Sequence, residues 1–297
     1  MFQPPGFCQH SLVTQLGKIA YYTAEASSWQ DSAQSRSQNT LVFLHGLGGG
    51  SSAYEWSKVY PAFAADYRVL APDLIGWGAS DHPERNYGVD DYLNTIAEFL
   101  QQTCQEPAMV IASSLTAALT IRVAIAHPEL FQSLILIAPT GLSDFGNDYR
   151  RSFFAQLVST PILDRLIYTT AVATSGGIRN FLEQRQFANA NRVYPEIVAA
   201  YLESATCPNA EYSALSFVRG DLCFDLATYL PQLTIPTAIL WGQQAQFTNV
   251  EVGRRLADLN PKAVRWFQSI PDSGLTPHLE LPAVTIGLMH QCFERLA

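Results

Sequence analysis

The feature that most constrains this chain is a regular alternation of short apolar runs with longer segments of helical pattern. The apolar runs lie at 41–44, 68–71, 109–112, 134–138, 237–241 and 264–267. Turn residues or a helical pattern follow each run, which is typical of buried parallel strands. Crossover helices, which parallel strands need, fit into 89–102, 116–126 and 250–259. The pattern predicts an α/β fold built on a mostly parallel sheet.

Two parts of the chain depart from this alternation, namely its start and the segment between the two groups of strands. A β-rich start is predicted at 12–15 and 18–24, and 27–40 is a polar loop. Between the two groups of strands the strand signal disappears. Helix starts at Thr160–Pro161 and Tyr194–Pro195, and a helix end at Gly220, replace it. We therefore predict a core of residues 1–142 and 230–297 and a helical cap of residues 143–229.

Many aromatic residues lie in the predicted cap. They are Tyr149, Phe153, Phe154, Tyr168, Phe181, Phe187, Tyr201, Tyr212, Phe217 and Phe224. One interpretation is that each simply packs the cap onto the core. Collectively they also fit an apolar cavity beneath a helical lid, which would take a hydrophobic small molecule.

Composition excludes several classes of protein. The chain has 297 residues, 48% of them hydrophobic and 15% charged, which suits one globular domain with an insertion. A net charge of −8 disfavours nucleic acid and anionic membrane surfaces as partners. The five cysteines contain no CxxC pair, so we predict no disulfide framework and no zinc site.

The same reasoning predicts a cytoplasmic protein without a transmembrane segment. The first ten residues, MFQPPGFCQH, lack the charged start and apolar stretch of a signal peptide. The most apolar stretch, 108–126, is interrupted by Arg122 and by several Ser and Thr residues, so we interpret it as buried core. An odd number of widely spaced cysteines also suits a reducing compartment.

A glycine-rich turn, HGLGGG at His45–Gly50, follows the first buried run. Such a turn lets backbone N–H groups approach a ligand closely. Gly46 and Gly48 begin the GxGxxG pattern of dinucleotide-binding proteins, but Ser51 stands at its last position. No Lys-Ser or Lys-Thr completes a phosphate-binding loop either. No cofactor and no metal are therefore expected.

Two further motifs decide between the remaining folds. DLIGWGAS occupies 73–80 and ASSLT occupies 112–116, each directly after a predicted strand. Together with HGLGGG, and with AHPEL, APTG and PHLELP further along, they resemble the α/β-hydrolase superfamily, of the esterase and lipase type. That resemblance implies an eight-stranded, mostly parallel sheet flanked by helices, with a helical cap inserted after strand 6.

In this superfamily a serine nucleophile sits on a strained turn between a strand and a helix, with small residues two positions before and after it. Ser114 satisfies this condition through Ala112 and Thr116, whereas Ser113 would have bulky Ile111 and Leu115. Thr116 departs from the usual glycine. Ser114 thus matches the nucleophile, although it also suits a tight turn with no chemical role.

The resemblance also assigns the other groups of the site. The N–H groups of Leu47 and Leu115 match the donors of the oxyanion hole. The acid and base positions are unfilled, because Ala245 follows the WG strand and Leu275 follows Gly274. His278 is the candidate replacement base and Asp144 the candidate acid, with Asp272 as another carboxylate. The plainer interpretation is that His278 lines or caps the last helix and that the carboxylates are solvated.

Two hypotheses about function follow. The first is a serine-hydrolase-like enzyme with a non-standard or impaired triad that acts on a hydrophobic ester or acyl compound. The second is a non-catalytic pseudo-hydrolase that binds a hydrophobic small molecule or a protein partner. In subtilisin, loss of the histidine alone lowers turnover by about 10⁶, so ordinary rates require a substitute base. Oligomeric state leaves no signal in the sequence.

Overall fold

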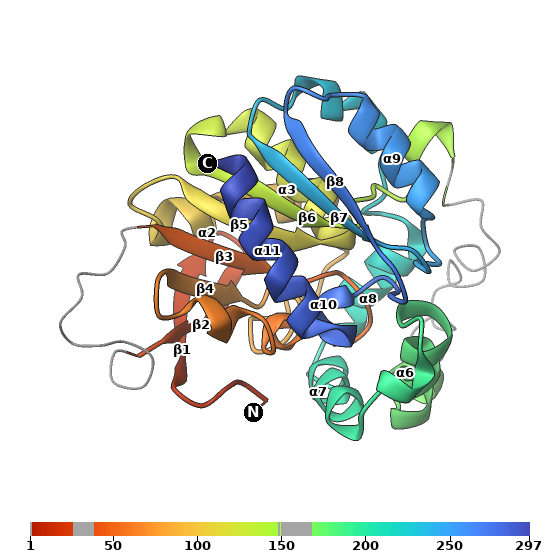
Figure 1. Cartoon of the computed structure of the whole chain (residues 1–297). Coiled ribbons are helices and arrows are strands. Elements are labelled where there is room, and N and C mark those ends of the chain that lie inside the picture. Colours follow the sequence, from red (N-terminus) through yellow and green to blue (C-terminus); the bar gives the residue numbers. More distant parts are fainter. Residues whose placement is uncertain (1, 26–38, 148, 150–167) are drawn as a thin grey trace.

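A computed structural model describes residues 2–25, 39–147, 149 and 168–297 (Figure 1). It contains one eight-stranded sheet in the order β1-β2-β4-β3-β5-β6-β7-β8. The first strands, β1, β2 and β4, pair antiparallel, and all later pairs from β4–β3 to β7–β8 are parallel. The predicted α/β-hydrolase fold, with its mostly parallel sheet, is confirmed. The strands are β1 (Phe7–Thr14), β2 (Gly17–Ala24), β3 (Thr40–Leu44), β4 (Arg68–Pro72), β5 (Ala108–Ser113), β6 (Phe131–Ile137), β7 (Thr237–Gly242) and β8 (Val264–Ile270).

Each predicted apolar run overlaps an observed strand. The central strands β3, β5 and β7 are buried along their whole length, which explains why they read as continuous hydrophobic runs. The outer strand β1 is longer than the predicted 12–15, because only its two ends are buried and its middle is polar. An edge strand that pairs with one neighbour alone gives a weak hydrophobic signal.

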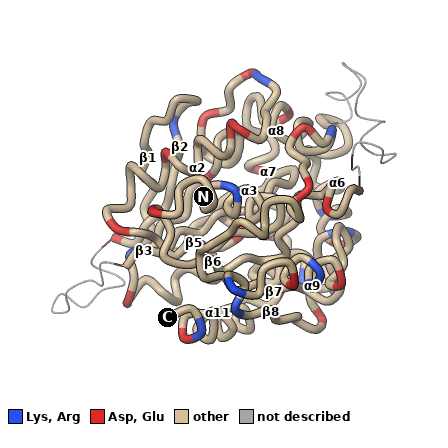
Figure 2. The backbone as a smooth tube through the Cα atoms, turned by 90° about the horizontal axis from the view of Figure 1, so that it is seen from above, with Lys and Arg blue, Asp and Glu red and all other residues tan. Residues whose placement is uncertain are grey.

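Helices cover both faces of the sheet (Figures 1 and 2). On one face α2 (Val89–Thr103) and α3 (Ser114–Ala126) pack against each other, and on the opposite face lies α11 (Pro282–Leu296). Helix α9 (Val250–Asp258) contacts β7 and β8. Helix α3 is apolar on nearly all sides, because it lies between the sheet and α2. The crossover helices predicted from the sequence are confirmed.

Further helices lie between β6 and β7, beyond the carboxyl ends of the parallel strands (Figure 1). They are η6 (Tyr168–Val172), α6 (Ser175–Phe181), η7 (Leu182–Gln186), η8 (Ala190–Arg192), α7 (Pro195–Ala205) and α8 (Ala210–Arg219). As predicted, Pro195 begins α7, and Gly220 ends α8 with a φ of 81°. The predicted start at Thr160–Pro161 lies outside the described residues. The exact division into core and cap, with its boundaries at 143 and 229, stays a proposal.

Short helices connect the remaining elements. They are η1 (Ala53–Trp56), η2 (Tyr60–Phe63), η3 (Pro128–Leu130), η4 (Asp144–Gly146), η9 (Leu226–Thr228), η10 (Leu230–Gln232) and α10 (Pro277–Glu280). Helix η1 follows the glycine-rich turn and contacts α10. These two short helices therefore bring residues 53–56 and 277–280, which are far apart in the sequence, into contact.

Charged residues of both signs are interspersed along the described chain (Figure 2). Even where arginines gather near α9 and α11, they lie over aromatic rings: Arg254 is 5.1 Å from the Phe267 ring and Arg295 is 4.6 Å from the Trp266 ring. These cations contribute to packing. Within the described ranges, no helix is both long enough and apolar enough to cross a membrane.

The start of α9 allows a first prediction about stability. The side chain of Asn249 accepts a hydrogen bond of 3.0 Å from the N–H of Val252 and so caps the helix. We expect Asn249→Ala to lower the free energy of unfolding by about 1 kcal/mol, because an N–H group of the first turn loses its partner. Urea denaturation measures this loss. Asn249→Ser, which keeps an acceptor oxygen, should stay close to the wild type, and equal losses in both variants would contradict the capping role.

Candidate functional site

The turn from β5 into α3 has the strained geometry expected of a nucleophile elbow. Strand β5 ends at Ser113, and Ser114 opens the helix with a φ of 55°. A positive φ is unfavourable for a residue that is not glycine and is retained where the surrounding structure imposes it. Ser114 is half-buried and stands at the amino end of a helix. The backbone thus presents Ser114, rather than Ser113, at the tip of the turn.

The glycine-rich turn is held by His45, which is fully buried. Its Nε2 accepts a hydrogen bond of 2.9 Å from the N–H of Leu74, and its Nδ1 lies 2.6 Å from the carbonyl oxygen of Gly46. Because Nε2 accepts, the proton is on Nδ1 and is donated to Gly46. Both ring nitrogens are committed to the backbone. His45 therefore orders the loop and is not free to accept a proton from Ser114.

A small cavity of about 30 Å³ lies beside Ser114. That volume holds about two water molecules. Leu47 lines it together with Ser114, whereas Leu115 is buried and is not among the lining residues. In the described part of the chain, no hydrogen bond occupies the N–H of Leu47. The remaining walls are Gly46, Gly48, Ser51, Glu55, Ser113, Leu142, Phe181, Gln186, Phe217, Phe247, Leu275 and Thr276.

The two positions that the sequence resemblance matched to the acid and the base carry buried aliphatic side chains. Ala245 and Leu275 are 7% and 8% exposed. Their loops lie side by side, because the N–H of Gln244 donates to the carbonyl of Ser273 and the N–H of Ser273 donates back to the Gln244 side chain. The backbone thus brings both positions together at the carboxyl edge of the sheet, but neither side chain can accept a proton.

The loop that carries Leu275 is anchored to the helices between β6 and β7. The N–H of Leu275 donates to the carbonyl of Gln186 at 2.8 Å, and the N–H of Gly274 donates to the Glu280 carboxylate at 2.7 Å. The same carboxylate accepts a hydrogen bond of 3.1 Å from Arg192, and its side chain has no solvent exposure. Charge-assisted bonds of this kind hold a loop firmly.

His278 lies in α10, ahead of the last helix, and is fully buried. Its ring stacks on Trp56 with centroids 3.9 Å apart, and its Nε2 is 3.9 Å from the carboxylate of Glu55. Within the described residues, neither ring nitrogen has a hydrogen bond, and His278 does not line the Ser114 cavity. Burial lowers the pKa of His278, against the opposing effect of Glu55, so the ring is neutral at pH 7.

Asp144 follows β6 as predicted, but its contacts are with its own loop and with the start of η9. Its carboxylate accepts hydrogen bonds from the Thr140 hydroxyl at 2.6 Å and from the N–H groups of Gly141 and Leu226. Burial raises its pKa despite these donors. The structure therefore places Ser114 and Leu47 at one cavity, His278 beside a different carboxylate, and Asp144 in a structural turn.

Glu55 is the functional candidate that sequence reasoning missed. It is 1% exposed, lines the Ser114 cavity, and accepts hydrogen bonds from the Gly46 N–H at 2.8 Å and the Tyr201 hydroxyl at 2.9 Å. Burial alone would raise its pKa, but the interactions with His278 and His45 outweigh burial and lower the pKa to about 2. A single acid between two aromatic residues, in AYEW, was the available signal.

The fold agrees with comparison against known proteins. The alpha/beta hydrolase family model matches residues 41–288, so the chain belongs to the alpha/beta hydrolase family. Among solved structures, a serine hydrolase involved in carbazole degradation superposes with a TM-score of 0.76 at 18% identity, covering 97% of this chain and 99% of that one. An epoxide hydrolase superposes equally well, with a TM-score of 0.76 at 20% identity, over 98% and 100% of the two chains. These likenesses establish the fold.

Sequence relatives are distant or partial. An uncharacterised protein of Mycobacterium tuberculosis is 31% identical over 103 residues, which is 35% of this chain and 30% of the relative's length. The 2-hydroxy-6-oxo-6-(2'-aminophenyl)hexa-2,4-dienoic acid hydrolase of Metapseudomonas resinovorans is 23% identical over 82% of this chain and 79% of its own. The 2-hydroxy-6-oxononadienedioate hydrolase of Cupriavidus pinatubonensis is 27% identical over 75% and 76%. The last two of these relatives are named as hydrolases.

Proposed function

We propose that this chain is a pseudo-hydrolase that binds a small hydrophobic ester or acyl compound at the Ser114 cavity and does not hydrolyse it through Ser114. The observation that carries the proposal is that Leu275 lines the cavity beside Ser114, and that among the described residues no imidazole does. A serine hydroxyl is a weak nucleophile unless an adjacent base takes its proton. The retained elbow and the N–H of Leu47 still offer a place for a carbonyl oxygen.

The proposal also covers the ligand, the cap and the location of the protein. The distant relatives act on carbonyl compounds by their names, which supports an acyl or ketone ligand. The apolar side chains of Phe181, Phe217 and Phe247 on the cavity wall support a hydrophobic one. We further propose residues 143–229 as the cap that carries Phe181 and Phe217, and the cytoplasm as the location. The alternative ligand is a protein partner that binds to this fold.

Labelling with a fluorophosphonate tests the proposal, since this probe reports the reactivity of a serine nucleophile. We expect no labelling of Ser114 on the timescale on which an active serine hydrolase reacts completely, and the same hydrolysis of p-nitrophenyl acetate by the wild type and Ser114→Ala. Mass spectrometry and absorbance measure the two results. Rapid labelling at Ser114, or ester turnover that disappears in Ser114→Ala, would refute it.

A second candidate rests on a specific observation, the pairing of His278 with Glu55. In this alternative Ser114 is active, and His278, held by Glu55, removes its proton through a water molecule in the cavity. Supporting it, the buried hydroxyls of Ser113 and Thr276, which line the cavity, have no hydrogen bond to any described residue. Buried polar groups without protein partners commonly bind ordered water.

One variant distinguishes the two candidate functions. His278→Gln preserves the size of the side chain but removes the basic ring nitrogen. If the alternative holds, labelling and turnover by the wild type are measurable and fall by at least about 100-fold in His278→Gln. Under the pseudo-hydrolase proposal the wild type is already inactive, and the variant does not differ from it.

A further inference from the structure

A second cavity lies on the other side of the segment that walls the Ser114 cavity. Ser51 and Glu55 line the Ser114 cavity, whereas Ser52 and Tyr54, between them in sequence, line the second one. The second cavity has a volume of about 130 Å³, compared with about 30 Å³ beside Ser114. It is close in size to cavities of about 150 Å³ that hold a molecule as large as benzene.

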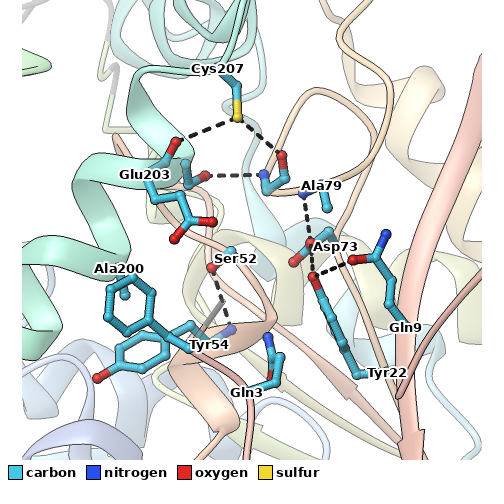
Figure 3. Close-up of a pocket in the computed structure, with 13 residues that line it drawn as sticks. Gln3, Gln9, Tyr22, Ser52, Tyr54, Asp73, Ala79, Ala200, Glu203 and Cys207 are labelled. Carbon is cyan, nitrogen blue, oxygen red and sulfur yellow. Dashed lines mark hydrogen bonds between the residues drawn. The ribbon is translucent and has the colours of Figure 1, made fainter. Parts of the chain in front are cut away.

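The walls of the second cavity come from distant parts of the chain (Figure 3). The amino-terminal residues Phe2 and Gln3 form one side, β1 and β2 supply Gln9 and Tyr22, and α7 supplies Ala200 and Glu203. The turn after β4 adds Asp73 and Ala79. Among the residues that the structure describes, two carboxylates line this cavity and no Lys or Arg does. A wall of this charge disfavours an anionic ligand and favours a cation.

The carboxylate of Glu203 points into this cavity, and it makes no hydrogen bond to the other residues shown in Figure 3. Among the described residues, only its backbone carbonyl accepts hydrogen bonds, from Thr206 and Cys207. Asp73, by contrast, is 1% exposed and is held by the N–H groups of Ala53 and Ala79 at 2.7 and 2.8 Å. Asp73 is therefore a fixed buried acceptor, and Glu203 is an exposed carboxylate on the cavity wall that remains available to a ligand.

Aromatic rings and amide groups complete the walls. The Phe2 and Tyr54 rings meet edge to face with centroids 5.9 Å apart, and the Tyr22 hydroxyl donates to Asp73 at 3.3 Å. Faces of aromatic rings attract organic cations, and the attraction strengthens when water is excluded. The Gln9 side chain lies beside the Tyr22 hydroxyl and adds hydrogen-bonding capacity.

We propose that this cavity is a second ligand site, separate from Ser114, which binds a small organic ammonium ion. Its ammonium group lies against Glu203, with Asp73 as the deeper negative charge, and its carbon atoms contact the rings of Phe2 and Tyr54. The volume limits the ligand to about six non-hydrogen atoms. A hydroxyl on such a ligand would reach the amide of Gln9, so a small amino alcohol suits the walls better than a purely apolar amine.

Calorimetric titration of the full chain with 2-aminoethanol at pH 7 tests this site. Ethylene glycol is the neutral comparison and acetate the anionic one. We expect 2-aminoethanol to bind at least about 10-fold more tightly than either, and Glu203→Gln to weaken it by at least about 10-fold. The matched control is Glu294→Gln, which neutralises an exposed carboxylate on α11 and should leave the affinity unchanged.

Two further variants make the outcome decisive. Ala200→Leu places a larger side chain on the cavity wall and should abolish binding without changing the net charge. Ser114→Ala should leave the affinity unchanged, because Ser114 belongs to the other cavity; failure of the pseudo-hydrolase proposal would therefore not alter this result. Equal affinity for ethylene glycol, or unchanged affinity in a folded Glu203→Gln protein, would overturn the ammonium site.

Discussion

Replacing Ala245 with Asp and Leu275 with His in the same chain should raise the hydrolysis of p-nitrophenyl acetate by at least about 100-fold. The two loops already lie side by side through the hydrogen bonds between Gln244 and Ser273. Ser114 already holds the strained φ of 55° that presents a nucleophile. Under the pseudo-hydrolase proposal, the site lacks only a group that accepts the serine proton and a carboxylate that orients this group.

The expected gain is a small part of what a complete triad supplies. In subtilisin the histidine is worth about 10⁶ in turnover, whereas general base catalysis by an imperfectly placed imidazole contributes about 10² to 10⁴. The anchoring of Leu275 to Gln186 limits how far the new imidazole can adjust. We therefore predict the lower end of that range for a site that was not shaped around this side chain.

Three control proteins locate the effect. Leu275→His alone should give a smaller gain, and Ala245→Asp alone none, because a carboxylate without an imidazole beside it has nothing to orient. Adding Ser114→Ala to the double variant should abolish the gain. Steady-state kinetics of folded, monodisperse protein measures these rates. A double variant that folds but hydrolyses the ester no faster than the wild type would show that the cavity no longer accepts an ester.

The sheet and the elbow were predictable because each depends on local patterns. Buried parallel strands appear as short apolar runs, and β3, β5 and β7 lie where those runs predicted. Ser114 was distinguishable from Ser113 because a tight turn excludes bulky residues at fixed offsets from its tip. The prediction that Ala245 and Leu275 occupy the acid and base positions rests on their offsets from WG and from Gly274, and it stays a prediction.

The pairing of His278 was not predictable, because packing between distant elements decides it. Sequence reasoning paired His278 with Asp144, whereas the structure brings η1 against α10 and places Glu55 beside the imidazole. Asp144 does follow β6, but Thr140 and two backbone N–H groups satisfy it there. No periodicity in AYEW shows that its acid faces inward. A buried carboxylate becomes recognisable only when its donors, Gly46 and Tyr201, are in place.

Glu55→Gln should lower the free energy of unfolding by about 3 kcal/mol at pH 7. The folded-state pKa of Glu55 is about 2, compared with an ordinary value of 4.5. A carboxylate whose pKa is depressed on folding stabilises the native state above its ordinary pKa, and this stabilisation is lost as the pH falls toward the folded value. The neutral amide keeps the shape but cannot accept from both Gly46 and Tyr201 as a carboxylate does.

The pH dependence distinguishes this charge effect from a packing defect. The difference between wild type and Glu55→Gln should shrink from about 3 kcal/mol at pH 7 to about 1 kcal/mol at pH 3, because protonation progressively removes the advantage of the wild type. His278 contributes a further loss below pH 6.5, since burial lowers its pKa and the unfolded chain takes up the proton more readily; this loss is smaller in the wild type, where Glu55 opposes the effect of burial. Urea denaturation of both proteins at pH 7, 5 and 3 measures their free energies of unfolding.

The control is Glu294→Gln, on the exposed side of α11, which should leave the free energy of unfolding unchanged at each pH. A difference between wild type and Glu55→Gln that stays constant from pH 7 to 3 would show that Glu55 is not held ionised by its neighbours.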